Sequence, residues 1–397
     1  MTTQSLAQGE KVVIQTETLG QLITLLREEG YDLVGPTVRD GAIVYDQVEN
    51  LQDLPVGWTE EQEAGCYRLK RRDDQAFFGY TVGPQSWKRF LHPPALRLFE
   101  TRKSETGFEI VAGTDSPKRY AFIGVRACEL AAIAIQDRVF LGDRYVDPVY
   151  QGRRERLFIL AVNCTQAAPT CFCTSMQTGP QAQSGFDLAL TELLAGEKHL
   201  FLMEVGSKRR AELLARLDYS DVGNDVKQLA EAGVERARSM IQRRLDTEGV
   251  HDLICENSES SRWDEIATRC LTCANCTMVC PTCFCTTVED VTDLAGVQSE
   301  RWRKWDSCFT TDFSYIHGGT IRTSSKSRYR QWMTHKLATW IDQFGTSGCV
   351  GCGRCISWCP VGIDITEEVR ALRQDTTNST SDTVPRFNGA KGDAPVE

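Results

Sequence analysis

Hydrophobic residues recur along the chain at spacings that predict a series of helices and strands. In 18–29 they lie three and four positions apart, which indicates an amphipathic helix ending at Gly30. Segments 119–125 and 156–162 are short continuous apolar runs, typical of buried strands. A broader apolar face over 225–246 predicts a long helix. We therefore expect an α/β or α+β domain over residues 1–250.

Cysteines follow both predicted buried strands closely. Cys128 comes three residues after the first strand, and Cys164 comes two residues after the second. In open α/β sheets, ligands bind beyond the carboxyl ends of the strands. If the two strands are neighbours, these thiols and the nearby Cys171 and Cys173 could converge at one site.

Composition limits the classes of function to consider. The 397 residues are 41% hydrophobic and 25% charged, which suits globular domains with a sizeable core. A net charge of −9 argues against nucleic acid as the main partner. No secretory signal is evident, and no apolar run reaches membrane-spanning length. We expect a cytoplasmic protein that does not bind a membrane.

The number and distribution of the cysteines indicate a more specific kind of protein than the overall composition does. Seventeen cysteines are present, twelve of them after residue 250, which indicates metal ligation in a reducing compartment and not a disulfide framework. The pattern C-x2-C-x2-C-x3-C-P occurs twice, at Cys270, Cys273, Cys276 and Cys280, and again at Cys349, Cys352, Cys355 and Cys359.

This spacing is the bacterial ferredoxin arrangement, in which the fourth cysteine of each run serves the other cluster. It predicts two [4Fe–4S] clusters. The first would be held by Cys270, Cys273, Cys276 and Cys359. The second would be held by Cys349, Cys352, Cys355 and Cys280. Two zinc knuckles are the alternative, but zinc sites usually show paired C-x2-C units. We therefore expect a mostly helical, ferredoxin-like dicluster domain over 251–373, and a disordered tail over 374–397.

The cysteines outside the two runs leave several interpretations open. Cys128, Cys164, Cys171 and Cys173 fit a third cluster, a zinc site or ordinary buried thiols. The hexapeptide 169–174 recurs at 281–286, where it contains Cys283 and Cys285. We expect these two, together with Cys308, Cys66 and Cys255, to be packing thiols. Eight Lys or Arg lie within 301–336. Three interpretations of this basic stretch stay open: a docking surface, positive charge that offsets the negative charge of reduced clusters, or a solvated helical face.

Several motifs together resemble a known family. They are Gly124-Val-Arg-Ala-Cys128-Glu, the segment Cys-Pro-Thr-Cys-Phe-Cys at 280–285, and Cys-Val-Gly-Cys-Gly-Arg-Cys at 349–355. The chain resembles the beta subunit of cytoplasmic sulfhydrogenase-type [NiFe] hydrogenases, and the related A subunit of anaerobic sulfite reductase, from about residue 20 to 370.

The resemblance implies a subunit that passes electrons between a flavin-containing NAD(P)H-oxidoreductase subunit and the hydrogenase small subunit. It also implies a cluster beyond the ferredoxin pair, which suits Cys128, Cys164, Cys171 and Cys173. The chain shows no dinucleotide fingerprint. We therefore expect a non-catalytic relay subunit. The equivalent subunit of a sulfite reductase, a redox-sensing regulator, and an enzyme reducing disulfides at the N-terminal thiols are the alternatives.

Overall fold

A seven-stranded mixed sheet forms the centre of the N-terminal region in the computed structural model, which describes residues 6–113, 118–142, 144–196 and 198–381. Its strands, in spatial order, are β1 (Lys11–Gln15), β11 (Lys198–Val205), β10 (Leu188–Ala195), β9 (Phe158–Val162), β8 (Tyr120–Arg126), β2 (Asp32–Arg39) and β3 (Ala42–Gln47).

The four central strands β2, β8, β9 and β10 run parallel, β3 and β11 pair antiparallel to this group, and β1 pairs antiparallel to β11. Every residue of β8 and β9 is buried, because helices and loops cover both faces of the sheet. The two apolar runs of the sequence are therefore strands and direct neighbours. This arrangement confirms the mixed α/β character expected for the N-terminal region.

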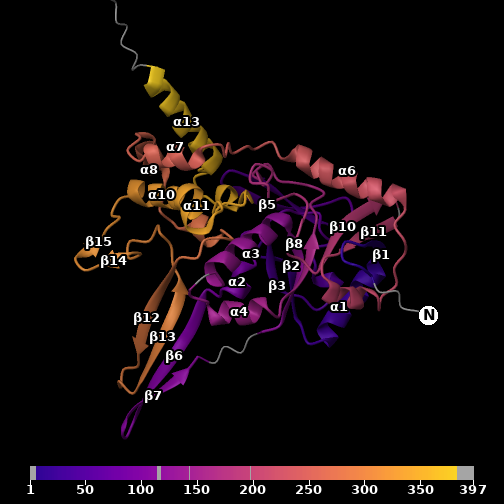
Figure 1. Cartoon of the computed structure of the whole chain (residues 1–397), viewed down its shortest axis with the longest axis horizontal. Coiled ribbons are helices and arrows are strands. Elements are labelled where there is room, and N and C mark those ends of the chain that lie inside the picture. The colour runs from indigo at the N-terminus through magenta and orange to yellow at the C-terminus, as the bar shows by residue number, and fades with distance from the viewer. Residues whose placement is uncertain (1–5, 114–117, 143, 197, 382–397) are drawn as a thin grey trace, which may run out of the picture.

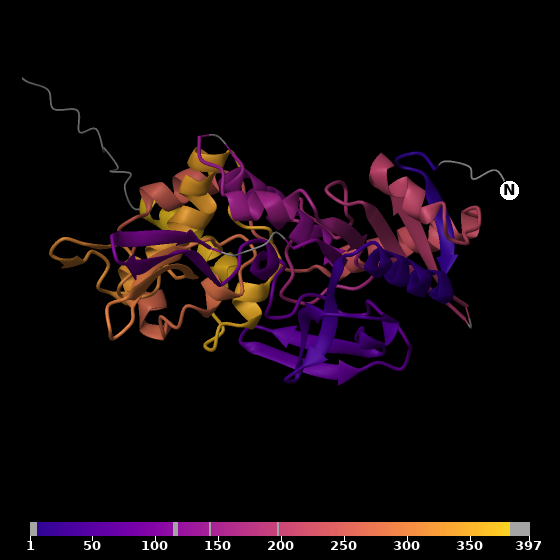
Figure 2. The ribbon, with the colours of Figure 1, turned by 90° about the horizontal axis from the view of Figure 1, so that it is seen from below.

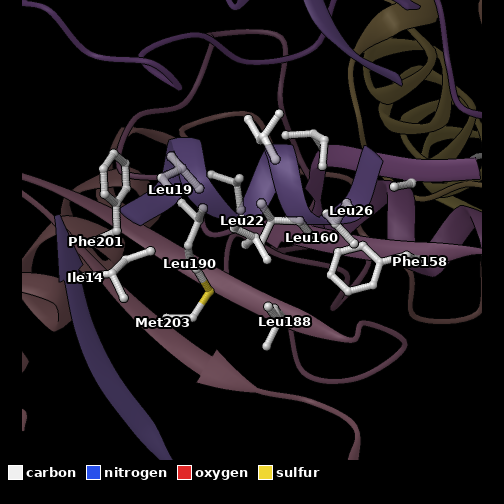
Figure 3. Close-up of a cluster of buried hydrophobic side chains, with 14 of the residues drawn as sticks. Ile14, Leu19, Leu22, Leu26, Phe158, Leu160, Leu188, Leu190, Phe201 and Met203 are labelled. Atoms are coloured by element: carbon white, nitrogen blue, oxygen red, sulfur yellow. The ribbon is translucent and has the colours of Figure 1, made fainter. Parts of the chain in front are cut away.

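Helix α1 (Thr16–Glu28) packs on one face of this sheet. Its residues Leu19, Leu22 and Leu26 are fully buried against the strands (Figure 3). They recur at helical spacing, so the amphipathic pattern read from the sequence is confirmed, and the helix gives way to a turn at Gly30 in the left-handed conformation. Helix α5 (Lys208–Leu214) contributes to the same core.

The opposite face carries three helices, α2 (Lys88–Leu91), α3 (Ala127–Phe140) and α4 (Pro148–Arg154). Helix α6 (Asn224–Met240) packs over β10 and β11 at the far end of the sheet. It stops six residues before the end of the predicted segment 225–246, since the backbone leaves the helical conformation at Ile241.

The C-terminal region gathers most of the remaining helices around a second core of aromatic and aliphatic side chains. Figure 2 shows these residues, in orange and yellow, at the end of the molecule opposite the N-terminus. The helical segments are α7 (Val250–Glu256), α8 (Arg262–Arg269), α9 (Asn275–Met278), α10 (Ser325–Thr334), a π-helical turn (His335–Thr339), α11 (Trp340–Phe344), α12 (Arg354–Ser357) and α13 (Ile365–Ser381).

A four-stranded antiparallel sheet projects from the body of the molecule (Figure 1). The prediction that residues 251–373 are mostly helical is therefore not confirmed, because two strands of this sheet belong to that region. Its strands, in spatial order, are β12 (Thr286–Thr292), β13 (Gln298–Trp305), β6 (Ala95–Ser104) and β7 (Gly107–Ala112). The basic stretch beginning at Arg301 is thus partly strand, because alternating Trp302 and Arg303 suit a half-exposed sheet. The sheet joins residues on both sides of the domain boundary expected near residue 250.

Three short elements complete the description of the fold. They are a 3₁₀ turn (Leu51–Asp53), the hairpin of β4 (Trp58–Glu63) and β5 (Cys66–Arg71), and the hairpin of β14 (Tyr315–Ile316) and β15 (Gly319–Thr320).

Residues 374–381 of the predicted disordered tail are helical. Helix α13 continues through Ser381, because Val369 and Leu372 anchor it in the second core and Thr376 lies 3.1 Å from the Asn257 side chain. Residues 382–397 of the predicted tail lie outside the described residues.

Candidate metal centres

The carboxyl ends of β8 and β9 bring the N-terminal cysteines to one edge of the sheet. Arg126 at the end of β8 pairs in register with Val162 at the end of β9. Cys128 therefore enters the first turn of α3 beside Cys164, as the strand order predicts. Burial raises the pKa of all four thiols, and their mutual repulsion adds to it at Cys173, which faces both Cys171 and Cys164.

The two ferredoxin-type runs face one another in the C-terminal region. A small cavity is lined by the first three cysteines of one run and the last cysteine of the other, namely Cys270, Cys273, Cys276 and Cys359. The thiol of Cys355 lies within electrostatic reach of Cys349, Cys352 and Cys280, and also of Cys276 in the other run. Cys355 borders the same cavity as the first set. Ligand exchange between the runs therefore stays a prediction.

Matching backbone geometry shapes both cysteine loops. In the first run Thr272 and Ala274 adopt the left-handed conformation, and in the second run Gly351 and Gly353 do so at the same two offsets from the first cysteine. Non-glycine residues hold this conformation at a cost of about 1–3 kcal/mol, which is typical of functional sites. The two loops thus curl alike, so that successive thiols can point to a common centre.

A buried lysine faces the sulfur of Cys280. Lys336 lies in the π-helical turn, and its Nζ donates to Cys280 Sγ at 3.3 Å, to Thr282 Oγ1 at 3.2 Å and to the carbonyl of Gly348 at 3.1 Å. The thiol of Cys283 donates a hydrogen bond to Cys280 and, together with Lys336, lowers the pKa of Cys280. Lys336 is the last residue of the basic stretch 301–336. Its position beside Cys280 agrees with the interpretation in which this stretch supplies positive charge to offset cluster charge.

The N-terminal thiols lie directly against the second ferredoxin-type loop. The N–H of Phe172 donates to the carbonyl of Gly351 at 2.9 Å. A Cβ placed on Gly351 would lie 2.6 Å from the Phe172 carbonyl oxygen and 2.7 Å from the Cα of Cys173, so only glycine fits this approach. Cys352 consequently shares an apolar cluster with Cys128 and Cys173.

Two buried arginines hold this junction together. Arg354, which lies between two cysteines of the second run, pairs with Glu129 of α3 and donates to the carbonyls of Gly83 and Gln85. The Nη1 atom of Arg126 lies 4.0 Å from the Sγ atom of Cys164, and its Nη2 donates to two backbone carbonyls. Sequence reasoning quoted both arginines inside motifs but gave them no role.

Cys283, Cys285 and Cys308 form a further group of thiols beside the second run. The neighbouring Cys308 lowers the pKa of Cys285 to about 7, while Cys285 raises the pKa of Cys308. A cavity of about 410 Å³ borders all three. Cys66 is half-buried in β5. Cys255 is exposed in α7, so the prediction that it is a packing thiol is wrong.

Among the residues that the structure describes, no three or more His, Cys, Asp or Glu side chains are grouped so that they could hold a metal ion. A cubane cluster differs from a single ion, because each of its cysteines binds a different iron. The described helices also include none long and apolar enough to span a membrane.

Comparison with known proteins places these features in context. Residues 269–363, which contain the eight cysteines of the two runs, match the family model of a 4Fe-4S dicluster domain. The chain is 29% identical over 366 residues to sulfhydrogenase 2 subunit beta of Pyrococcus furiosus, covering 90% of this chain and 98% of that protein. No solved structure matches. The resemblance to sulfhydrogenase beta subunits is thus confirmed along nearly the whole chain, and within it the chain carries a 4Fe-4S dicluster domain.

Proposed function

We propose that this chain is the iron–sulfur electron-transfer subunit of a cytoplasmic [NiFe] hydrogenase complex. It connects a flavin-containing NAD(P)H-oxidoreductase subunit with the hydrogenase small subunit. The dicluster domain and the similarity to a sulfhydrogenase beta subunit support this proposal. Iron–sulfur clusters, when bound, accept and donate electrons at potentials set by charge, hydrogen bonds and solvent exposure.

The residues present fit three [4Fe–4S] clusters. Each donor set consists of four thiols, and buried cations lie beside two of the sets to offset thiolate charge. The first cluster is assigned to Cys270, Cys273, Cys276 and Cys359. The second is assigned to Cys349, Cys352, Cys355 and Cys280. The third is assigned to Cys128, Cys164, Cys171 and Cys173.

The observation that carries the proposal is the position of the loop 349–355 between the other two thiol sets. Cys355 borders the cavity of the first set. Cys352, from the same loop, packs with Cys128 and Cys173 of the third set. These contacts support our proposal that the three centres follow one another in space, with the second in the middle. Such a series suits a conduit that receives electrons at one end of the chain and delivers them at the other.

The test is iron and sulfide analysis of the anaerobically purified full-length chain, with EPR spectroscopy. We expect about twelve irons per chain, as three [4Fe–4S] clusters require. Cys171→Ala should lower the content by about four irons, and Cys255→Ser, which changes an exposed thiol outside the three sets, should not. About eight irons in both the parent and Cys171→Ala would overturn the third cluster.

Ligand exchange between the runs has its own test in Cys280→Ser. We expect this variant to lose the EPR signal of the cluster held by Cys349, Cys352 and Cys355 and to retain the signal of the cluster held by the first run. Loss of the first-run cluster instead would contradict the assignment. Isolation of the complex from its native cells addresses the partners, since co-purification with sulfite reductase subunits would overturn the hydrogenase assignment.

A further inference from the structure

A segment of twelve residues that contains three cysteines of the third thiol set recurs, with nine residues identical, where it overlaps the end of the first run. The segment Asn-Cys-Thr-Gln-Ala-Ala-Pro-Thr-Cys-Phe-Cys-Thr at 163–174 returns at 275–286 as Asn-Cys-Thr-Met-Val-Cys-Pro-Thr-Cys-Phe-Cys-Thr. Both copies touch the second cysteine loop: Phe172 N–H donates to the Gly351 carbonyl, and the Thr282 hydroxyl donates to the Gly348 carbonyl. The cysteine pair of the first copy belongs to the third set, whereas Cys283 and Cys285 of the second copy have no role in the proposed clusters.

The hairpin of β12 and β13 places Cys285 next to Cys308. Strand β12 begins one residue after Cys285, and the N–H of Asp306, just past the end of β13, donates to the Cys285 carbonyl at 2.9 Å. From there the chain turns so that Cys308 lines the same cavity as Cys285, and the neighbouring Cys308 lowers the pKa of Cys285.

Two buried lysines lie beside these thiols. Lys88 is 4% exposed and Lys336 is 3% exposed, and in the described part of the chain neither has a carboxylate partner. Lys88 Nζ donates to the Cys283 carbonyl at 2.9 Å and lies 4.0 Å from the centre of the Trp305 ring. Burial lowers the pKa of Lys88, whereas the neighbouring Cys280 and Cys283 raise the pKa of Lys336 against the opposing effect of burial, so Lys336 is the cation that favours thiolate sulfur here.

The pair is accessible from one side and adjacent to the clusters on the other. Cys285 and Cys308 are half-buried, and both line the cavity of about 410 Å³ together with Phe284, His335 and Trp340. Trp332 lines this cavity and also the cavity of the first cysteine set. The two cavities therefore share the Trp332 side chain.

We propose that Cys285 and Cys308 form a redox-active dithiol that exchanges electrons with the iron–sulfur clusters. Oxidation forms the Cys285–Cys308 disulfide, releases two protons to water in the cavity, and passes two electrons singly to two of the clusters. Reduction is the reverse. The inference rests on the proposed function, because the clusters supply and remove the electrons. The lowered pKa of Cys285 agrees with it, since the thiolate is the reactive form of cysteine.

Differential alkylation of the full-length chain tests the proposal. The chain is equilibrated anaerobically at a series of potentials with redox mediators, denatured in iodoacetamide, reduced, treated with a second alkylating label and analysed by peptide mass spectrometry. At oxidising potentials we expect a Cys285–Cys308 linked peptide and the second label on both residues. At reducing potentials both should carry only the first. The ratio of the two forms should change tenfold for about every 30 mV, as a two-electron couple requires.

Cys308→Ser should abolish the second label on Cys285 and leave the iron content unchanged, and Cys255→Ser should alter neither. If both residues of the parent chain remain thiols at every potential, the dithiol is excluded, whatever the variants do. If Cys308→Ser loses about four irons, the residue is a cluster ligand and the proposal is wrong. EPR signals of the clusters in the same samples report on the proposed function separately.

Discussion

Arg354 and Glu129 form an ion pair of 2.5 Å in which neither side chain exposes more than 1% of its surface. Arg354 belongs to the second cysteine loop, whereas Glu129 follows Cys128 in α3. The same carboxylate accepts hydrogen bonds from the Tyr45 hydroxyl at 2.7 Å and the Trp87 indole at 2.9 Å. This pair therefore fastens the C-terminal cysteine loop to the N-terminal sheet at the junction of two proposed clusters.

Glu129→Gln is expected to destabilise the protein by about 3–5 kcal/mol, because it leaves the buried Arg354 charge without its partner. Anaerobic urea unfolding followed by fluorescence measures the change. Glu235→Gln is the matched control, since its exposed pair with Arg238 should contribute less than about 1 kcal/mol. Equal effects of the two substitutions would show that the buried pair does not fasten the regions.

Gly351→Ala should separate the second cysteine loop from residues 172–173. The new Cβ would collide with backbone atoms that have no room to move. Gly345→Ala is the control, because Gly345 has a similar positive φ of 67° but open space around its Cβ position. Both variants bear the strain of about 1–2 kcal/mol from the left-handed conformation. Only Gly351→Ala should in addition lose iron, which colorimetric iron analysis measures, and equal iron loss in both variants would contradict the close approach.

His92 should make stability fall at mildly acidic pH. Burial, followed by the neighbouring Arg303, lowers the pKa of His92 to about 3, whereas an unfolded histidine titrates near about 6.5. The unfolded chain alone therefore binds this proton between the two values, so the contribution of His92 is complete above about pH 6.5 and declines as the pH falls toward 3.

The effect is measured by urea unfolding at pH 7.5 and pH 5.5. Between these values the parent chain should lose up to about 1.4 kcal/mol more than His92→Phe, which keeps a ring stacked on Phe140 but cannot bind a proton. Parallel losses in both proteins would exclude His92 as the source.

The sequence was informative wherever the signal was local. The apolar runs of β8 and β9 predicted two buried strands, and the cysteines that follow them lie at the expected edge because parallel neighbouring strands end together. The two ferredoxin-type runs, which share their cysteine spacing, likewise form loops with left-handed backbone at the same two positions.

The remaining features depend on contacts between residues far apart in the chain. Lys88 reaches the Cys283 carbonyl across 195 positions, and Arg354 reaches Glu129 across 225. No periodicity or motif in one sequence reports such pairs. Strand β13 escaped prediction for the same reason, since its antiparallel partner β6 lies in the other half of the chain.

The pairing of β6 with β13 also determines when this sheet can form during synthesis of the chain. Residue Lys304 pairs with Ala95, so the sheet cannot be completed until about 200 further residues have been made. At typical translation rates this takes roughly 10 to 40 s. During that time one edge of β6 is unpaired, and such edges invite association with other chains. The charged residues Arg97, Glu100 and Arg102 on β6 provide protection on the ribosome, before any cluster can be assembled.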